Sequence, residues 1–164
     1  MNEKNTEKLL RDFPRLYRGL RCFACGDGWF PLIHKLSADI ENEAMRTGTR
    51  MESEQWPQAI QVKEKFGTLR YYIVAPDAED RDSKIELSVE ARGGLMSFRP
   101  VAKAKGIFDL IEAAESASGS ICEECGQPAS LLSNGGWWRT LCRPCDDRRR
   151  EEARKEIARR MEDQ

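Results

Sequence analysis

Histidine, long apolar runs and an excess charge of one sign are all scarce in this sequence, and each scarcity excludes a class of protein. A single His among 164 residues rules out His-rich metal sites and multi-His catalysis within one chain. No stretch approaches the about 18 apolar residues that a membrane-spanning helix requires. Because 27 Lys and Arg residues face 28 Asp and Glu residues, for a net charge of −1, the chain is not a polybasic nucleic-acid coat. Residues 1–12 alternate charges where a secretory signal has an apolar core, which predicts a cytoplasmic protein.

Six Cys residues are the most informative feature that is present, because they fall into three Cys-x-x-Cys pairs. In a reducing compartment such pairs indicate metal binding or redox chemistry, not a disulfide framework. Residues 122–145 have the spacing C-x2-C-x16-C-x2-C, in which each of two turns presents two thiolates to one ion. The sequence therefore predicts a structural Zn²⁺ site with the ligands Cys122, Cys125, Cys142 and Cys145.

The segment around these four Cys residues predicts a treble-clef-like finger. Residues 129–132 and 137–141 read as two strands around an Asn-Gly-Gly turn, and a charged helix follows Cys145. Four Cys ligands close the coordination sphere, so the expected metal is structural and not catalytic. Two alternatives stay open: four reduced cysteines without metal, and a distant likeness to the ligand-plus-glutamate pattern of nucleoside deaminases.

The first pair, Cys22 and Cys25, has no such partner pair, and two thiolates cannot complete a tetrahedral site. Three interpretations are open. The two thiols are reduced and partly buried at a helix entrance, or they form a second metal half-site, or they are a redox pair at a helix N-terminus. The half-site would be completed by another subunit, or by His34 with a further ligand.

Hydrophobic periodicity predicts an α+β domain over residues 1–119, in which a small antiparallel sheet is packed by helices. Apolar residues at steps of three and four predict helices over residues 29–46 and 106–117. Alternation over residues 58–75 predicts two strands around a turn at Phe66-Gly67 or Gly67-Thr68. Beyond an acidic loop over residues 76–84, a third strand is expected from Ile85, Leu87, Val89 and Ala91, and a fourth around Leu95 and Phe98.

The two faces of the predicted hairpin differ in character. The inner face is expected to carry Ile60, Val62 and Glu64 opposite Leu69, Tyr71 and Ile73. The other face is basic and aromatic, and could contact phosphates and stack a base. We therefore regard Lys63, Lys65, Arg70 and Tyr72, together with Trp138 and Arg139 on the finger, as candidate macromolecule-binding residues. The alternative is an ordinary solvated sheet face, with at least one Trp packed against the finger.

Residues 120–164 are expected to form the finger and its charged C-terminal helix, after a linker of small residues. The chain over residues 139–164 carries nine positive and seven negative charges. Its apolar stripe consists of Ala153, Ile157 and Met161 alone, which predicts a mostly solvated helix or a partner-docking edge.

The order of three motifs resembles a family of small, largely uncharacterised proteins of bacteriophages, prophages and bacteria. The motifs are CGDGWFPLI, QVKEKFGTLRYYI, and CEECG followed by GGWWRTLC. In that family a Gly-Asp-Gly-Trp helix start and a Lys-Glu-Lys-Phe-Gly-x-Leu-Arg hairpin precede a four-Cys finger. The resemblance covers most of residues 22–146 and implies a phage-type accessory protein in the cytoplasm of a bacterial host cell. It assigns no catalytic residue.

We expect a non-enzymatic, zinc-binding accessory or regulatory protein that acts by binding a macromolecular partner. The closed metal site, and the lack of both a nucleophile–base pair and a phosphate-cradling Gly loop, lead to this expectation. A host or phage protein is favoured as the partner, and inhibition of a host or defence protein would be one outcome. The alternatives are DNA or RNA binding and, more remotely, a zinc-dependent enzyme that uses Glu64, Asp27 or Glu124.

Overall fold

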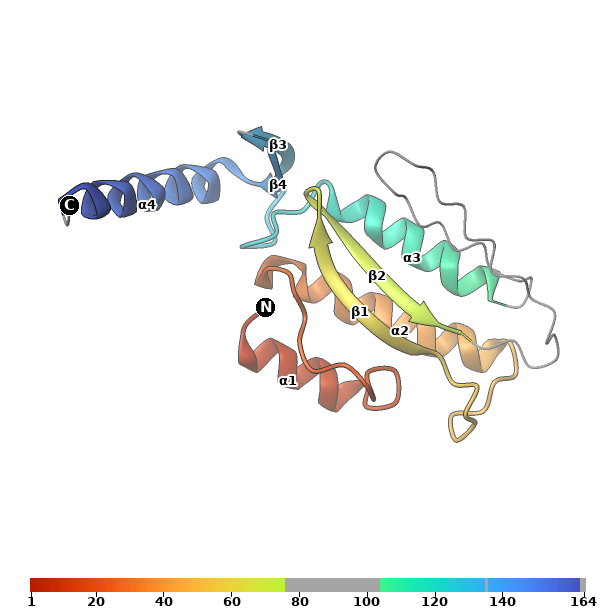
Figure 1. Ribbon diagram of the computed structural model, residues 1–164. Coiled ribbons are helices and arrows are strands. Elements are labelled where there is room, and N and C mark those ends of the chain that lie inside the picture. Colours follow the sequence, from red (N-terminus) through yellow and green to blue (C-terminus); the bar gives the residue numbers. More distant parts are fainter. Residues whose placement is uncertain (76–103, 135, 163–164) are drawn as a thin grey trace, which may run out of the picture.

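The computed structural model describes residues 1–75, 104–134 and 136–162. This part of the chain contains four α-helices, a short 3-10 helix and two antiparallel hairpins, which confirms the predicted α+β class (Figure 1). The predicted acidic loop and the predicted third and fourth strands lie outside the described residues. The elements are α1 (Glu3–Asp12), the 3-10 helix (Asp27–Trp29), α2 (Phe30–Arg46), β1 (Gln58–Lys65), β2 (Thr68–Val74), α3 (Lys105–Ser118), β3 (Ser130–Asn134), β4 (Trp137–Leu141) and α4 (Arg143–Glu162).

The two predicted helices of the first domain are confirmed. The Gly-Asp-Gly-Trp motif forms the 3-10 turn, and α2 follows it with Pro31 in its first turn, where a missing N–H costs little. The helix ends at Thr47, and Gly48 follows with a φ of +85°, the left-handed conformation that commonly terminates helices. Helix α3 exceeds its predicted range by one residue at each end.

Helix α1 was not predicted, because its sequence has only two adjacent Leu residues among charged ones. Asn2 caps it: the side-chain oxygen accepts the N–H of Asn5 at 2.8 Å. Leu9 on its inner face is fully buried. A short helix with so few apolar residues depends on tertiary packing for its stability.

The β1–β2 hairpin has its turn at Phe66-Gly67. Its strands have the predicted antiparallel pairing from Lys65 opposite Thr68 to Gln61 opposite Tyr72. One inner-face assignment is wrong. A bulge between Ala59 and Gln61 shifts the register, so Ala59 is buried and Ile60 is 60% exposed. An extra residue in one strand reverses the facing of every residue beyond it, and the alternation pattern alone does not reveal it.

Both edges of this two-stranded sheet are covered by other parts of the chain. On the β1 side, Ala24 N–H donates to the Val62 carbonyl at 3.0 Å, and Glu64 N–H donates to the Ala24 carbonyl at 2.9 Å. On the β2 side, α3 provides two side-chain acceptors: Ser118 Oγ for Leu69 N–H and Glu115 Oε1 for Tyr71 N–H, both at 2.8 Å. These contacts leave fewer unpaired edge groups for association with other strands.

The main core lies between the inner face of this hairpin and the helices. Trp29, Ile33 and Ile40 of the 3-10 turn and α2 are fully buried there, as is Leu69 of β2. A short buried polar chain crosses the core, in which Tyr71 Oη donates to Tyr17 Oη at 3.1 Å and Tyr17 Oη lies 2.5 Å from Ser37 Oγ. Burial raises the pKa of Tyr17 to about 12.

The C-terminal part consists of the β3–β4 hairpin and α4. The strands lie close to their predicted ranges. Figure 1 shows α4 projecting away from the rest of the described chain. Apart from Cys145, its side chains from Arg143 to Met161 are partly or fully exposed. None of the described helices is long and apolar enough to cross a membrane.

Candidate metal centre

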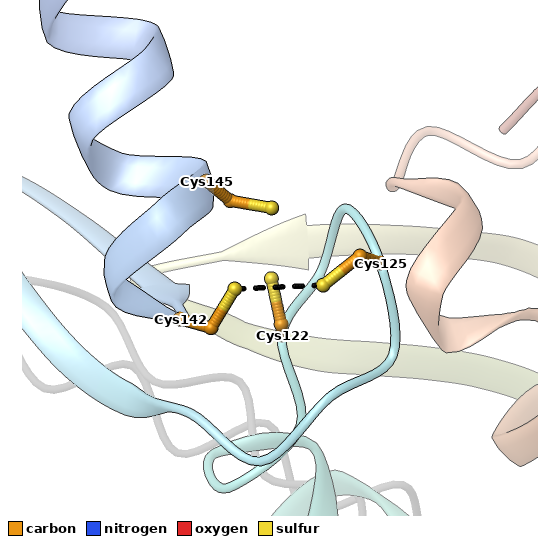
Figure 2. Close-up of side chains that lie close together, drawn as sticks. All are labelled: Cys122, Cys125, Cys142 and Cys145. Atoms are coloured by element: carbon orange, nitrogen blue, oxygen red, sulfur yellow. Dashed lines mark hydrogen bonds between the residues drawn. The ribbon is translucent and has the colours of Figure 1, made fainter.

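Four cysteines from two distant parts of the sequence meet in one cluster. Cys122 and Cys125 lie on the loop before β3, and Cys142 and Cys145 lie at the start of α4 (Figure 2). Their sulfurs all lie within 4.8 Å of one another, so the cluster can hold a metal ion. Cys122 and Cys145 are buried, Cys142 is half-buried and Cys125 is exposed. The structure thus brings together the four predicted ligands.

Cys122 and Cys125 are presented by a tight backbone turn. Gly126 has a φ of +76°, which a residue with a side chain rarely adopts, and its N–H donates to the Cys122 carbonyl at 2.9 Å. The Cys122 N–H in turn donates to the Gln127 carbonyl at 2.7 Å. We call residues 122–126 the knuckle. This turn places both sulfurs on one side of the loop.

The second pair is presented by the end of a strand and the first turn of a helix. Cys142 follows β4, and Asp146 N–H donates to the Cys142 carbonyl at 3.0 Å to begin the α4 hydrogen-bond ladder. Cys145 lies within the first helical turn. Burial and the neighbouring cysteines raise the pKa of the Cys145 thiol, and the partial positive charge at the helix N-terminus acts in the opposite direction.

The geometry fits tetrahedral coordination. A Zn–S distance of about 2.3 Å implies an edge of about 3.8 Å between sulfurs of a ZnS₄ tetrahedron. The Cys125 and Cys142 sulfurs lie 3.5 Å apart, close to this edge. Backbone N–H groups also favour ionisation: although burial opposes it, hydrogen bonds from Cys142, Cys125 and Glu124 lower the pKa of Cys122 to about 7. Four thiolates in this arrangement leave no position for a substrate or water.

Charged side chains from α4 brace the knuckle. Arg148 Nη2 donates to Glu124 Oε2 at 2.5 Å, and Arg149 Nε donates to Glu124 Oε1. These two hydrogen bonds outweigh burial and lower the pKa of Glu124. Arg148 Nη2 also lies 3.6 Å from Cys145 Sγ. A guanidinium at this position offsets part of the negative charge that four thiolates bring to a divalent ion.

The knuckle docks onto the Gly-Asp-Gly-Trp motif of the first domain. Gly28 N–H donates to the Glu123 carbonyl at 2.7 Å, and Gly26 N–H donates to Glu123 Oε1 at 3.0 Å. Trp29 Nε1 donates to the Ile121 carbonyl at 2.8 Å. Three hydrogen bonds from one short motif thus fix the first half of the metal centre.

The two glycines of this motif are required by close approach. A Cβ atom on Gly26 would lie 2.2 Å from the Glu123 carbonyl oxygen, and one on Gly28 would lie 2.1 Å from the Cys122 carbonyl oxygen. Both distances are far below van der Waals contact, and both neighbours are backbone atoms. The motif therefore serves as a docking surface for the knuckle as well as a helix start.

A second contact joins the tip of the β1–β2 hairpin to the open end of the β3–β4 hairpin. Thr140 Oγ1 of β4 donates to the Gly67 carbonyl at 2.6 Å, and Thr140 is fully buried. A Cβ atom on Gly67 would lie 2.1 Å from Leu131 Cδ1 of β3. The four-Cys unit, residues 120–145, is therefore attached to the first domain at two places.

The structure distributes the six predicted macromolecule-binding residues over two surfaces. Lys63, Lys65 and Tyr72 lie on the outer face of the β1–β2 hairpin, and the Lys63 ammonium lies 5.3 Å from the Tyr72 ring centroid. Arg70 belongs to this face, but its Nη1 donates to Thr68 Oγ1 and the Leu69 carbonyl.

Trp138 and Arg139 point to opposite sides of β4. Trp138 shares the side of Thr140, which faces the Phe66-Gly67 turn, and is 45% exposed. Arg139 lines a shallow groove between β4 and α4, and its Nη1 lies 3.9 Å from Glu123 Oε2.

Cys22 and Cys25 differ in environment. Cys22 is exposed, whereas Cys25 is buried in the main core, and burial raises the pKa of the Cys25 thiol to about 12. His34 faces away from them: its Nε2 lies 3.0 Å from Asp12 Oδ2, and its ring packs on Phe13. Within the part of the chain that the structure describes, the only cluster of three or more metal-ligating side chains is the four-Cys cluster.

Comparison with models of protein families, with curated proteins and with solved structures found no match to this chain.

Sequence reasoning found the ligands but missed the residues that support them. The sequence signal for these supporting residues is Glu123 and Glu124, between Cys122 and Cys125, since charged residues between ligands of a buried centre need partners. Their partners, Gly26 and Arg149, lie 97 and 25 residues away in the chain. No local pattern connects residues at such separations.

Proposed function

We propose that this chain is a non-enzymatic, zinc-stabilised accessory or regulatory protein that acts by binding a macromolecular partner. The observation that carries the proposal is the position of the four-Cys unit. Its knuckle is docked on the first domain, and its hairpin exposes Trp137 and Trp138 by 76% and 45%. The metal thus builds and orients a surface.

Zinc is the metal that this donor set fits best. Four thiolates in two Cys-x-x-Cys turns are the ligands of structural zinc, and zinc has no competing geometric preference. Binding of a structural zinc ion contributes about 10–16 kcal/mol of apparent free energy in small fingers. The buried apolar cluster of this unit contains only Leu141 besides Cys122 and Cys145, so packing alone offers little stability.

The acidic groups that an enzyme would use here support the non-enzymatic proposal, because each one holds the fold together. Glu64 Oε1 accepts Gly67 N–H at 2.6 Å in the hairpin turn. Asp27 Oδ1 accepts Asn2 N–H at 2.8 Å, and Glu124 accepts two arginines of α4. A carboxylate with these partners is poorly placed to take a proton from a substrate.

The resemblance to the phage and prophage family extends the proposal to a phage-type accessory protein in a bacterial host cell. The structure supports it by giving two of the shared motifs a joint role, since Gly-Asp-Gly-Trp docks the four-Cys knuckle. On this proposal the partner is a host or phage protein, and binding inhibits a host or defence function.

Nucleic acid is the second candidate partner, and one observation favours it. The outer face of the β1–β2 hairpin presents Lys63, Lys65 and Tyr72, while Glu64 of the same strand points inward to the turn. Basic and aromatic groups gathered on one face are typical of surfaces that bind single strands.

The proposal is tested with the full chain purified with its metal. We expect one zinc per chain by native mass spectrometry, and retention of a stable partner in a pull-down from host lysate. A protein partner survives nuclease treatment and a nucleic-acid partner does not. Retention that chelation abolishes supports the zinc-stabilised surface. Purified protein without bound metal, or metal-loaded protein that retains neither class of partner, would refute the proposal.

A further inference from the structure

One face of the β1–β2 hairpin combines positive charge with a partly exposed surface. Pairing places Gln61, Lys63 and Lys65 of β1 beside Arg70 and Tyr72 of β2, and we call these five residues the outer face. Among the described residues, neither lysine has a carboxylate within ion-pairing distance, whereas Arg70 Nη1 lies 3.9 Å from Glu115 Oε2 of α3. Figure 1 shows α2 on one side of the hairpin and none of the labelled elements over the other.

Phe66 at the end of this face has an unfavourable backbone conformation, and packing of its side chain does not offset the energetic cost. Its φ is +54°, a left-handed value at which Asn, Asp and Gly are the favoured residues of a two-residue hairpin turn. The side chain is nevertheless 65% exposed, so it stabilises no core. Residues held in such conformations concentrate at functional sites. An exposed aromatic ring at this position is explained by contact with a partner.

The four-Cys unit extends the same surface. The Thr140–Gly67 hydrogen bond holds the side of the β3–β4 hairpin that carries Leu131 and Trp138 toward the Phe66-Gly67 turn. Leu131 and Trp138 are 43% and 45% exposed. Trp138 thus lies on the side of β4 that faces the Phe66-Gly67 turn, two residues from the Thr140–Gly67 contact.

We infer that the outer face, with Phe66 and Trp138, is a binding surface for single-stranded nucleic acid. This inference rests on the proposed function only as the binding of a macromolecule. It takes nucleic acid, the second candidate partner, in place of a protein, and specifies the site. Lysines that are free of carboxylates complement phosphates, and exposed rings stack on unpaired bases whatever their sequence. The Lys65 ammonium lies 5.3 Å from the Phe66 ring centroid, so a base on that ring brings its phosphate near a cation.

Two features favour a single strand over a duplex or an acidic protein. Bases in a duplex are stacked on each other and present no free ring face to Phe66. An acidic protein would match Lys63 and Lys65, but it gives no reason for separate exposed rings on a flat face, because protein hot spots gather aromatics in packed pockets.

The deciding variant is Phe66→Asn, because Asn suits the left-handed turn and removes only the ring. We expect it to unfold at the wild-type temperature or above, and to bind a labelled mixed-sequence oligonucleotide of about 20 nucleotides about tenfold more weakly. Fluorescence anisotropy with the zinc-loaded full chain measures the affinity. Met45→Asn is the matched control, since Met45 is 50% exposed on α2, away from this face. It should bind as the wild type does.

The salt dependence supplies a second readout. For single strands, log K falls with log salt by about 0.7 for each neutralised phosphate. Lys63→Gln should reduce the magnitude of this slope by about 0.7, whereas Lys4→Gln on α1 should not change it. Polyglutamate serves as the acidic-protein probe and should not bind competitively.

Several results would overturn the inference. These are equal affinity of Phe66→Asn and the wild type, equal affinity for single strand and duplex, competition by polyglutamate, or no binding of the oligonucleotide. A specific protein partner retained after nuclease treatment, without oligonucleotide binding, refutes this inference alone. Absence of both oligonucleotide binding and a retained protein partner refutes the proposed function as well.

Discussion

Gly28 allows the docking of the metal centre to be tested with one added carbon atom. In Gly28→Ala, the new Cβ would lie 2.1 Å from the Cys122 carbonyl oxygen, 2.4 Å from the Gly126 nitrogen and 2.7 Å from the Cys125 nitrogen. All three neighbours are backbone atoms of the knuckle, so no side chain can rotate away. Either the knuckle or the 3-10 turn must move.

The expected loss follows from the contacts that such a movement breaks. The motif donates three hydrogen bonds to residues 121–123, from Gly26, Gly28 and Trp29. At about 1 kcal/mol for each, separation costs about 3 kcal/mol. For a chain of this size that lowers the unfolding temperature by about 6–12 °C.

The same loss of free energy is only a small fraction of the free energy with which a structural metal ion binds. About 3 kcal/mol corresponds to an about 100-fold loss of affinity. Structural zinc binds with about 10–16 kcal/mol, so Gly28→Ala should still be purified with stoichiometric metal. It should lose that metal to a competing chelator at concentrations that leave the wild type loaded.

Calorimetry and chelator competition measure the two quantities, and Gly19→Ala is the control. Nothing lies within 4 Å of a Cβ atom on Gly19, so this variant should change stability by no more than about 1 kcal/mol in either direction. If Gly28→Ala and Gly19→Ala unfold at the same temperature, the docking argument is wrong.

Three further predictions test other contacts. Chelation should unfold residues 120–145 and also expose the amides of Gly26 and Gly28, whose acceptor is Glu123. Hydrogen exchange with and without chelator measures this exposure. Unchanged protection in both segments would contradict the prediction. Thr140→Val keeps the shape of Thr140 but leaves the Gly67 carbonyl without its donor, so urea unfolding of the zinc-loaded variant should show a loss of about 1–2 kcal/mol. Wild-type stability of this variant would show that the two hairpins are not coupled through Thr140. Burial raises the pKa of Glu115, although the N–H of Tyr71 and the charge of Arg70 act to lower it. This carboxyl therefore stabilises the fold most below its unfolded pKa of about 4.3. That stability is lost as the pH rises through the pKa of the folded state. Glu115→Gln keeps an acceptor for Tyr71 N–H, and its stability relative to the wild type should therefore increase with pH across this window in urea titrations; a relative decrease would contradict the assignment.

The parts of the fold that follow from local pattern were predictable from the sequence. The period of two placed Val62, Leu69 and Tyr71 on one face, and the turn residues located the hairpin tip. The spacing of the four Cys residues identified the metal cluster, because ligand geometry is imposed by the ion itself. Pattern failed at Ile60, where a bulge inserts one residue without changing composition.

The parts that depend on long-range contact could not be predicted. Gly26 and Gly28 read as a helix start, since their close approach to the knuckle becomes visible only once Glu123 is placed beside them. Trp138 and Arg139 read as one set of candidate residues, although strand alternation places neighbouring residues on opposite sides of β4. The partner of each side depends on long-range contacts. Cys22 and Cys25 have the spacing of a ligand pair, but one is exposed and the other lies in the core.

The two attachments of the four-Cys unit explain why metal, motif and surface are linked. The unit buries one Leu besides two of its ligands, so its shape depends on the ion and on the first domain. On the proposed function, a bound ion fixes the knuckle to α4. The Gly-Asp-Gly-Trp motif fixes the knuckle to the first domain, and Thr140 then brings β4 against the Phe66-Gly67 turn. Because Trp138 is positioned only at the end of this series, Gly28→Ala should weaken binding at the outer face although Gly28 does not belong to it. A variant that lost docking but kept full oligonucleotide affinity would separate the four-Cys unit from the binding surface.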